Sequence, residues 1–302
     1  MFQDPILVIA FNKPSLLGEL LEFLSQNTLS DIYIHLDGPT SDNSNRYLND
    51  RCKQIIGKFE SNRKNTFIFS HSTNLGGQFG VLRAIDWFFS NVTFGLILEE
   101  DISISPLAFE FISRQKKLLQ EPQIFAICLF NPIENLEMNL EIDHWLPWGW
   151  ATNSSHWRGY RAQLEGNSLR LRRKPIPSPA CRLPVRFFLN SVLDKIESKQ
   201  IETWDAQVHI VHIIRGDRSI FPHQTLSKHK GNTSQATHAD SIDWWKHLNF
   251  PMALVDEIDR VNHNTNNMRF EVLWRMSWRG VFSDLVHSIS GRVKLWLRLK
   301  EL

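Results

Sequence analysis

Short apolar runs alternate with helical patterns over the first hundred residues of the chain. Four of these runs have the length of buried strands and are apolar on both faces: 6–11, 31–37, 65–71 and 93–101. The segments between them repeat apolar residues at helical spacing: 15–26, the segment around Ile55 and Ile56, and 78–91. Strands that alternate with helices in this way predict an α/β fold, with a mostly parallel sheet buried on both faces by helices.

The same alternation continues less regularly beyond residue 101. A helix is predicted over 106–119, begun by Pro106 in its first turn, and a buried strand is predicted over 123–130. Residues 131–190 are rich in Pro, Arg and Trp and are expected to be irregular. Two further segments with apolar periodicity follow: a helix over 187–200, and a helix, turn and strand over 202–222.

The C-terminal segment has a basic pattern of its own. Segment 268–302 carries seven Lys or Arg residues against three acids, with apolar residues and Trp at helical spacing and Gly291 as a break. A basic amphipathic helix of this kind can lie on an anionic membrane surface. The alternative is a helix that packs on the domain or on a partner subunit. Both interpretations predict a helical C-terminal tail.

Composition and charge narrow the class of protein. The chain has 302 residues, of which 42% are hydrophobic, enough for one large α/β domain or two small ones. Its formal net charge of +2 gives no global reason to expect a nucleic-acid partner. The three Cys residues are far apart and match no metal spacing, and the N-terminal apolar run is too short for a signal peptide or a membrane span. We therefore expect a cytoplasmic protein with reduced thiols.

Three consecutive acids come at the end of the fourth predicted strand. Glu99, Glu100 and Asp101 lie at its carboxyl end, the edge at which open α/β sheets bind ligands. Clustered carboxylates repel one another unless a cation is bound, and Mg²⁺ or Mn²⁺ takes carboxylate oxygens together with substrate phosphates. The alternative is that one acid caps the next helix while the others face solvent. The tripeptide alone leaves both interpretations open.

Seven short motifs follow one another along the chain: PILVIAFNKPSLL, IHLDGP, NLGGQFGVLRAIDWFF, LEEDISISPLAFEF, PWGWATNSSHW, ETWDAQ and SKHKGNTSQATH. In this order they resemble glycosyltransferases of the GT-A fold. The sequence is similar in particular to the transferases that add the first branching N-acetylglucosamine to N-glycans, and to bacterial hemolysin-like nucleotide-diphosphosugar transferases. The resemblance implies a Rossmann-like GT-A domain over 1–240, with a donor half over 1–130 and an acceptor half over 131–240. A basic, Trp-rich helical extension would then occupy 241–302.

By this resemblance the nucleotide base lies at the ends of the first two strands. Asn12 and Lys13 would lie next to the base, and Asp37 would accept a hydrogen bond from a uracil N–H. Asp37 is also followed by Gly38, and Asp-Gly is a common turn pair, so a purely structural role is the alternative.

The phosphates are expected near a glycine pair and several basic residues. Gly76 and Gly77 would let backbone approach the nucleotide just before a helix begins. Arg83 on that helix would reach a phosphate or be an ordinary surface residue. The basic run 228–230 would screen phosphate charge or be solvated.

The resemblance also gives the acids at 99–101 separate roles. Asp101 would ligate the metal, while Glu99 and Glu100 would contact sugar and ribose hydroxyls. Many enzymes of this fold carry Asp-x-Asp here, so metal ligation by Glu99 is not implied. His238 would complete the metal shell or touch the diphosphate, against the alternative of a surface histidine.

The acceptor side depends on the fifth and sixth motifs. Asp205 would be the general base that deprotonates the acceptor hydroxyl, and it is also suited to begin the helical run that follows. The Trp-Gly-Trp turn would form an apolar surface against a pyranose ring, or it would be a buried turn filled by the two indoles. The expected sugar or acceptor contacts are Trp148, Gly149, Trp150, Trp204 and Gln207.

The resemblance implies a metal-dependent, inverting glycosyltransferase that uses Mn²⁺ or Mg²⁺ and a UDP-sugar. The acceptor would be a glycan or a lipid-linked hydroxyl in bacterial polysaccharide biosynthesis, with the tail at the inner face of the membrane. The alternatives are a nucleotidyltransferase acting on sugar phosphates and a non-catalytic carbohydrate- or membrane-surface-binding protein of the same fold. A nucleotidyltransferase usually needs a Gly-rich phosphate loop after the first strand, and the FNKPS segment has the Lys but no glycine.

Overall fold

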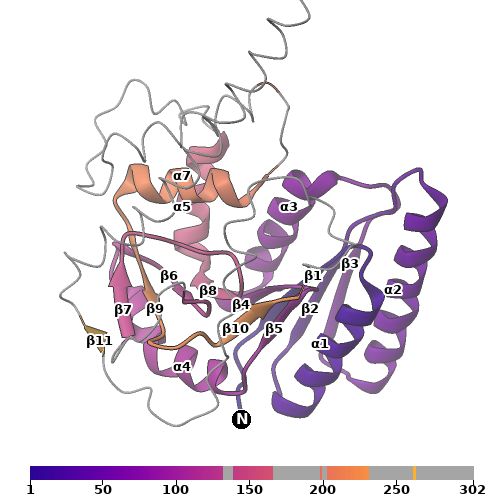
Figure 1. Cartoon of the computed structure of the whole chain (residues 1–302), viewed down its shortest axis with the longest axis horizontal. Helices are drawn as coiled ribbons and strands as arrows, with labels where there is room; N and C mark the ends of the chain where they lie inside the picture. The colour runs from indigo at the N-terminus through magenta and orange to yellow at the C-terminus, as the bar shows by residue number, and fades with distance from the viewer. Residues whose placement is uncertain (132–138, 166–197, 199–202, 231–260, 263–302) are drawn as a thin grey trace, which may run out of the picture.

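A computed structural model of the chain has a central sheet with helices on both faces (Figure 1). It describes residues 1–131, 139–165, 198, 203–230 and 261–262. Within this part of the chain, no helix is long and apolar enough to cross a membrane. Three features expected from the sequence lie outside the described residues: the helix over 187–200 apart from residue 198, the basic tail 268–302 and His238.

The first hundred residues alternate strand and helix as the sequence predicts. The elements are β1 (Ile6–Ala10), α1 (Pro14–Asn27), β2 (Ile32–Leu36), α2 (Asn43–Asn62), β3 (Thr66–Ser70), α3 (Gly76–Asn91) and β4 (Phe94–Glu99). Pro14 lies in the first turn of α1, where a missing N–H leaves no helical hydrogen bond unmade. Asp42 caps α2 by accepting a hydrogen bond of 2.9 Å from the backbone N of Asn45.

The second half contains more regular structure than the sequence predicts. The elements are β5 (Ile102–Ile104), α4 (Leu107–Gln115), a 3₁₀ helix η1 (Lys116–Gln120), β6 (Ile124–Cys128), β7 (Asn139–Ile142), β8 (Trp150–Asn153), α5 (Ser154–Glu165), α7 (Asp205–Arg215), β9 (Arg218–Phe221), β10 (Ser227–His229) and β11 (Val261–Asn262). The expectation of irregular structure over 131–190 is wrong where β7, β8 and α5 occur. Strands of four residues are too short for a period of two to stand out.

The strand order creates one natural ligand-binding edge. The main sheet of the described residues runs β11-β7-β9-β6-β8-β4-β1-β2-β3, and β5 and β10 form a separate pair. Strands β3, β2, β1 and β4 are parallel neighbours, while β8 is antiparallel between β4 and β6. The chain moves outward from β1 through β2 to β3 and returns to β4 on the other side of β1. Ligands of open α/β sheets bind at the carboxyl ends of strands at such a switch point.

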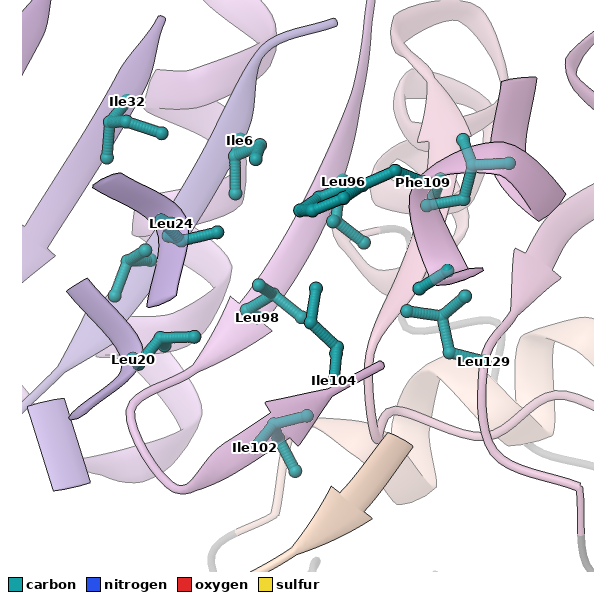
Figure 2. Packing of buried hydrophobic residues seen from close by; sticks show 14 of the residues in the cluster. Ile6, Leu20, Leu24, Ile32, Leu96, Leu98, Ile102, Ile104, Phe109 and Leu129 are labelled. Atoms are coloured by element: carbon teal, nitrogen blue, oxygen red, sulfur yellow. The ribbon is translucent and has the colours of Figure 1, made fainter. Parts of the chain in front are cut away.

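The two faces of the sheet are buried in separate apolar layers. Alternate residues of β1 point to opposite layers: Ile6 and Val8 pack with α1, α2 and α4, while Leu7 and Ile9 pack with α3, α5 and α7. Figure 2 shows the first layer, in which side chains of β4, β5 and α4 meet. Each fully buried large aliphatic side chain contributes about 1.5–3 kcal/mol. This packing fixes the strand ends that carry the polar residues described next. The α/β class with a mostly parallel sheet is therefore confirmed.

Candidate functional site

The ends of β1 and β4 are joined by backbone hydrogen bonds. Ile9 of β1 is paired in register with Glu99 of β4, and the backbone N of Glu100 donates to the O of Ile9 over 2.9 Å. The chain leaving β1 passes through Asn12 and Lys13 into α1. Residues from two motifs that are almost ninety positions apart in the sequence therefore meet at the switch point.

Glu100 ties the loop after β1 to the end of β4. Its Oε1 accepts hydrogen bonds from the backbone N of Asn12 (3.1 Å) and of Lys13 (3.2 Å). Its Oε2 is buried without a hydrogen-bond partner in the described part of the chain. Burial raises the pKa of Glu100 to about 7, although the amides of Phe11 and Asn12 and the charge of Lys13 oppose the shift. The Glu100 carboxylate, which was expected to contact ribose, instead fixes the backbone of the loop after β1.

Asp101 is paired with two basic side chains. Lys13 Nζ lies 2.5 Å from Asp101 Oδ2, with 17% and 6% of the two side chains exposed. His229 Nε2 lies 3.5 Å from the same oxygen. Burial lowers the pKa of Lys13, but Asp101, Glu100 and Glu99 outweigh this effect and raise it overall. The ammonium is therefore charged, and it partly neutralises the acids around it.

Strand β10 brings His229 to this position. β10 pairs antiparallel with β5, so that His229 is opposite Ile102 and Lys228 is opposite Ser103. The backbone N of Lys230 then donates to the O of Asp101 over 2.7 Å. Burial lowers the pKa of His229, with Asp101 opposing the shift. The basic run expected only to screen phosphate or face solvent thus includes a strand that contacts the acid turn directly.

Asp205 lies close enough to the acid turn to influence it. Burial, the charge of Asp101 and then that of Asp205 together raise the pKa of Glu99 to about 8, with Lys13 opposing the shift. Asp205 begins α7 and accepts a hydrogen bond from the hydroxyl of Thr203. The side-chain amide of Gln207 donates to the Thr203 carbonyl over 2.9 Å, which fixes the turn before the helix. The predicted base and the acid turn therefore belong to one electrostatic cluster.

The three tryptophans expected near a sugar differ in exposure. Trp148 is partly buried, and its ring centroid lies 6.1 Å from that of His229 and 4.6 Å from that of Phe130. Trp150 is fully buried, and Trp204 is nearly so; their stacked rings lie 6.4 Å apart. Gly149 has a φ of +82°, which favours glycine in the turn between the indoles. Trp148 is the indole beside the site, and Trp150 and Trp204 are part of the core.

The Asp37 carboxylate joins the loop after β2 to the loop before α3. The Asp37 carboxylate accepts hydrogen bonds from the backbone N of Gly38 (2.8 Å) and Leu75 (2.9 Å) and from the side chain of Asn74 (3.1 Å). Burial raises the pKa of Asp37, while these backbone bonds oppose the shift. A Cβ on Gly38 would lie 2.3 Å from the backbone C of Thr73, so only glycine fits there. To contact a uracil N–H as well, the Asp37 carboxylate would have to accept a further hydrogen bond beyond these.

A buried asparagine connects the loops after β1 and β2. The side-chain amide of Asn49, on α2, donates to the O of Phe11 over 2.7 Å and to the O of Asp37 over 2.8 Å. The residue is fully buried. Sequence reasoning missed this residue because an Asn inside a polar helix gives no signal of its tertiary partners.

The glycine pair and Arg83 lie on α3. Gly76 begins the helix with a φ of +82°, and Gly77 follows in the first turn. Arg83 is exposed one to two turns later. Its charge, after burial and the charge of His71, contributes to lowering the pKa of His35 to about 3. These residues lie beside the Asp37 loop rather than at the acid turn.

The described residues do not form a closed site for a divalent cation. No three His, Cys, Asp or Glu side chains of the described chain are grouped so as to hold a metal ion. The Asp101 oxygen that was expected to bind a metal is paired with Lys13, and the Asp101 carbonyl is bonded to Lys230. The second expected ligand, His238, lies outside the described residues. Within the described residues, a cation at this oxygen would therefore have to replace the Lys13 ammonium.

No protein-family model and no curated protein matches the chain. Several solved structures have partial structural similarity to it. A mannosyltransferase from Pyrobaculum calidifontis, solved with GDP-Man and Mn²⁺, has 9% sequence identity and a TM-score of 0.39, with 72% of this chain and 70% of that chain covered. A cytidylyltransferase from Leptospira borgpetersenii has 14% identity and a TM-score of 0.33, with 66% and 73% covered. Mouse xyloside xylosyltransferase 1 has 10% identity and a TM-score of 0.31, with 70% and 81% covered.

These neighbours are glycosyl- and nucleotidyltransferases by name, but similarities this low carry no functional argument.

Proposed function

We propose that the chain is a glycosyltransferase that uses a nucleotide-diphosphate sugar. The donor would bind at the carboxyl ends of β1 and β4, with its diphosphate near Lys13 and His229 and its sugar near Glu99. The acceptor hydroxyl would approach from the side of α7. A site of this kind agrees with the binding edge of an open α/β sheet.

The observation that carries the proposal is the electrostatic contact between Asp205 and Glu99. The charge of Asp205 contributes to raising the pKa of Glu99 to about 8, so the two carboxyl groups interact electrostatically. Lys13 and His229 lie against Asp101 in the same turn. The Lys13 ammonium for a leaving diphosphate and a carboxylate base for an acceptor are therefore available within one electrostatic cluster.

Transfer of the sugar from the nucleotide to the acceptor needs only a base for the acceptor hydroxyl and positive charge at the leaving diphosphate. The acceptor oxygen forms a bond to the anomeric carbon while the bond from that carbon to the diphosphate breaks, and the diphosphate leaves with the electron pair. Asp205 takes the acceptor proton; a carboxylate of ordinary pKa suffices, because the hydroxyl becomes acidic as it bonds to carbon. Positive charge near the departing oxygens stabilises the transition state. A single displacement of this type inverts the anomeric carbon.

The finer assignments come from the sequence resemblance. Asn12 and Asp37 would contact a uracil base, which makes UDP the proposed nucleotide. The acceptor would be a glycan or lipid-linked hydroxyl of polysaccharide biosynthesis. The basic tail 268–302 would bring the enzyme to the inner face of a membrane. Mn²⁺ or Mg²⁺ remains the cofactor expected from the resemblance, but no step above depends on it.

The experiment is a donor assay with purified full-length chain. UDP-, GDP- and CDP-sugars are incubated with and without simple sugar acceptors, and released nucleoside diphosphate and pyrophosphate are both quantified. Release of nucleoside diphosphate that is lost in Asp205→Asn supports the proposal. Pyrophosphate formed from a nucleoside triphosphate and a sugar phosphate would indicate a nucleotidyltransferase instead. Thermal stabilisation by sugars without turnover of any donor would indicate a non-catalytic binding protein.

A further inference from the structure

We propose that Lys13, rather than a divalent cation, supplies the positive charge at Asp101, so that the donor diphosphate binds without a metal. The inference rests on the proposed function for the identity of the diphosphate ligand. Its structural part, the competition between Lys13 and a cation for Asp101, stands without that function.

The position of Lys13 is determined by three independent contacts. Its ammonium lies 2.5 Å from Asp101 Oδ2. Its backbone N donates to Glu100 over 3.2 Å. Its carbonyl accepts the first helical hydrogen bond of α1, from the N of Leu17 over 3.0 Å. The side chain therefore leaves a fixed backbone, so the ion pair does not depend on a freely moving surface lysine.

Lys13 lies where a cation would neutralise the acid turn. The carboxylates of Asp101, Glu100 and Glu99 each raise the pKa of Lys13, so they stabilise its charged form. A divalent ion at Asp101 would have to displace this ammonium from a mostly buried carboxylate. Within the described residues it would not find a ready-made set of ligands, because no three His, Cys, Asp or Glu side chains there are grouped to hold a metal ion and Glu100 Oε1 already accepts from the backbone N of Asn12 and Lys13.

An ammonium shared between Asp101 and a diphosphate can replace a metal electrostatically. Lysine is an established phosphate ligand that acts as a point charge. Asp101 is in this scheme a positioning residue: it aims Lys13 and reduces its freedom in the absence of donor. His229, 3.5 Å from the same oxygen, is placed to add a second donor on the diphosphate side.

The first test measures binding of UDP, GDP and CDP to the full chain by calorimetry, in EDTA and in Mn²⁺. The proposal predicts that the tightest of these binds equally well, within about twofold, in both buffers. Lys13→Met lowers that affinity about tenfold or more in EDTA, as expected for loss of a charge-assisted contact, whereas Lys13→Arg retains most of it. Binding that disappears in EDTA and returns with Mn²⁺ overturns the proposal, as does unchanged binding to Lys13→Met in EDTA.

The second test uses Mn²⁺ alone and needs no nucleotide. Free Mn²⁺ is titrated into wild-type protein and Lys13→Met, and bound ion is followed by electron paramagnetic resonance. The variant should bind Mn²⁺ at least about tenfold more tightly, because its Asp101 is no longer paired. Equal or weaker binding by the variant overturns the proposal. If no nucleotide binds under any condition, the proposed function fails, and this titration still decides the role of Lys13.

A folding control accompanies both tests. Lys13→Met leaves Asp101 without its closest partner, so its thermal midpoint is recorded beside those of the wild type and Lys13→Arg. If Lys13→Met does not fold, Asp101→Asn with Lys13 intact takes its place in the nucleotide titration. That variant keeps nucleotide binding within about fivefold if Lys13 is the diphosphate ligand, and loses binding entirely if Asp101 holds a required metal.

Discussion

Lys13 and Asp101 are 88 positions apart in the sequence, yet their side chains meet over 2.5 Å at the switch point of the sheet. The pair joins the loop after β1 to the turn after β4. It also places the single lysine of the first loop on the acid that the sequence assigns to a metal. The charge balance of the site therefore depends on a contact that the sequence motifs alone do not reveal.

Loss of the Lys13 ammonium should destabilise the fold. Asp101 is mostly buried, so Lys13→Met leaves a carboxylate with reduced compensation, and we expect the free energy of unfolding to fall by about 1–3 kcal/mol. Denaturant titration at pH 7 measures the change. Lys13→Arg, which keeps the charge, is the control and should lose much less. Equal stability of all three proteins would mean that the ion pair contributes nothing in solution.

Replacing Asp205 should lower the turnover of the enzyme and change the pKa of Glu99. Asp205→Asn removes the proposed base, and we expect turnover to fall by at least about 100-fold with nucleotide binding retained. Because the negative charge of Asp205 raises the pKa of Glu99, the same substitution should lower that pKa.

Carbon-detected NMR titration of the Glu99 carboxyl in wild type and Asp205→Asn measures this shift. Thr203→Val is a matched control, since it removes the hydroxyl that bonds Asp205 but keeps the carboxylate charge. An unchanged Glu99 titration in Asp205→Asn would contradict a shared cluster.

Glu100 should stabilise the fold through its two hydrogen bonds to the backbone more than through its negative charge. Glu100→Gln keeps an acceptor oxygen for the backbone N–H groups of Asn12 and Lys13, so we expect a change in unfolding free energy below about 1 kcal/mol. Glu100→Ala loses both hydrogen bonds and should cost about 2–3 kcal/mol. Urea titration of the two variants side by side checks this difference. Equal losses would place the importance of Glu100 in its negative charge instead.

Acid should weaken the fold through buried histidines. Burial, with His71 and Arg83, lowers the pKa of His35 from 6.5 to about 3, and neither ring nitrogen has a hydrogen-bond partner in the described chain. The unfolded chain therefore binds a proton that the folded chain does not, and stability falls as the pH drops from 6.5 towards 3. One such group contributes up to ~1.4 kcal/mol per pH unit in this window.

His35→Phe isolates this effect from that of the other buried histidines. It keeps an aromatic ring against Phe69, whose centroid lies 5.6 Å from that of His35. The slope of unfolding free energy against pH between 4 and 6 should be shallower than in the wild type by about one proton. Parallel curves for the two proteins would mean that His35 does not titrate on unfolding in this range.

The first hundred residues could be predicted from the sequence because β1, β2 and β4 are short runs in which nearly every residue is apolar and buried. Asp101 follows β4 closely and Asp205 begins α7, so the predicted boundaries of these elements also placed the two acids at element ends. β10 was not, since three residues cannot display a period and its partner β5 is far away in the chain. Neither was the exposure of each Trp, because an indole suits a core and a sugar site equally well. The partners of Lys13 and Asn49 could not be predicted from the sequence, because they are distant in the chain and meet these residues only in the folded structure.

The central claim is that one cluster holds a nucleotide-sugar diphosphate through Lys13 and activates an acceptor through Asp205. The most direct measurement is release of nucleoside diphosphate from a panel of nucleotide sugars in EDTA, by wild type, Lys13→Met and Asp205→Asn. The account predicts turnover of at least one donor by the wild type without metal, and a loss of at least about tenfold in each variant. Turnover that needs added Mn²⁺, or that survives in Asp205→Asn, would contradict it.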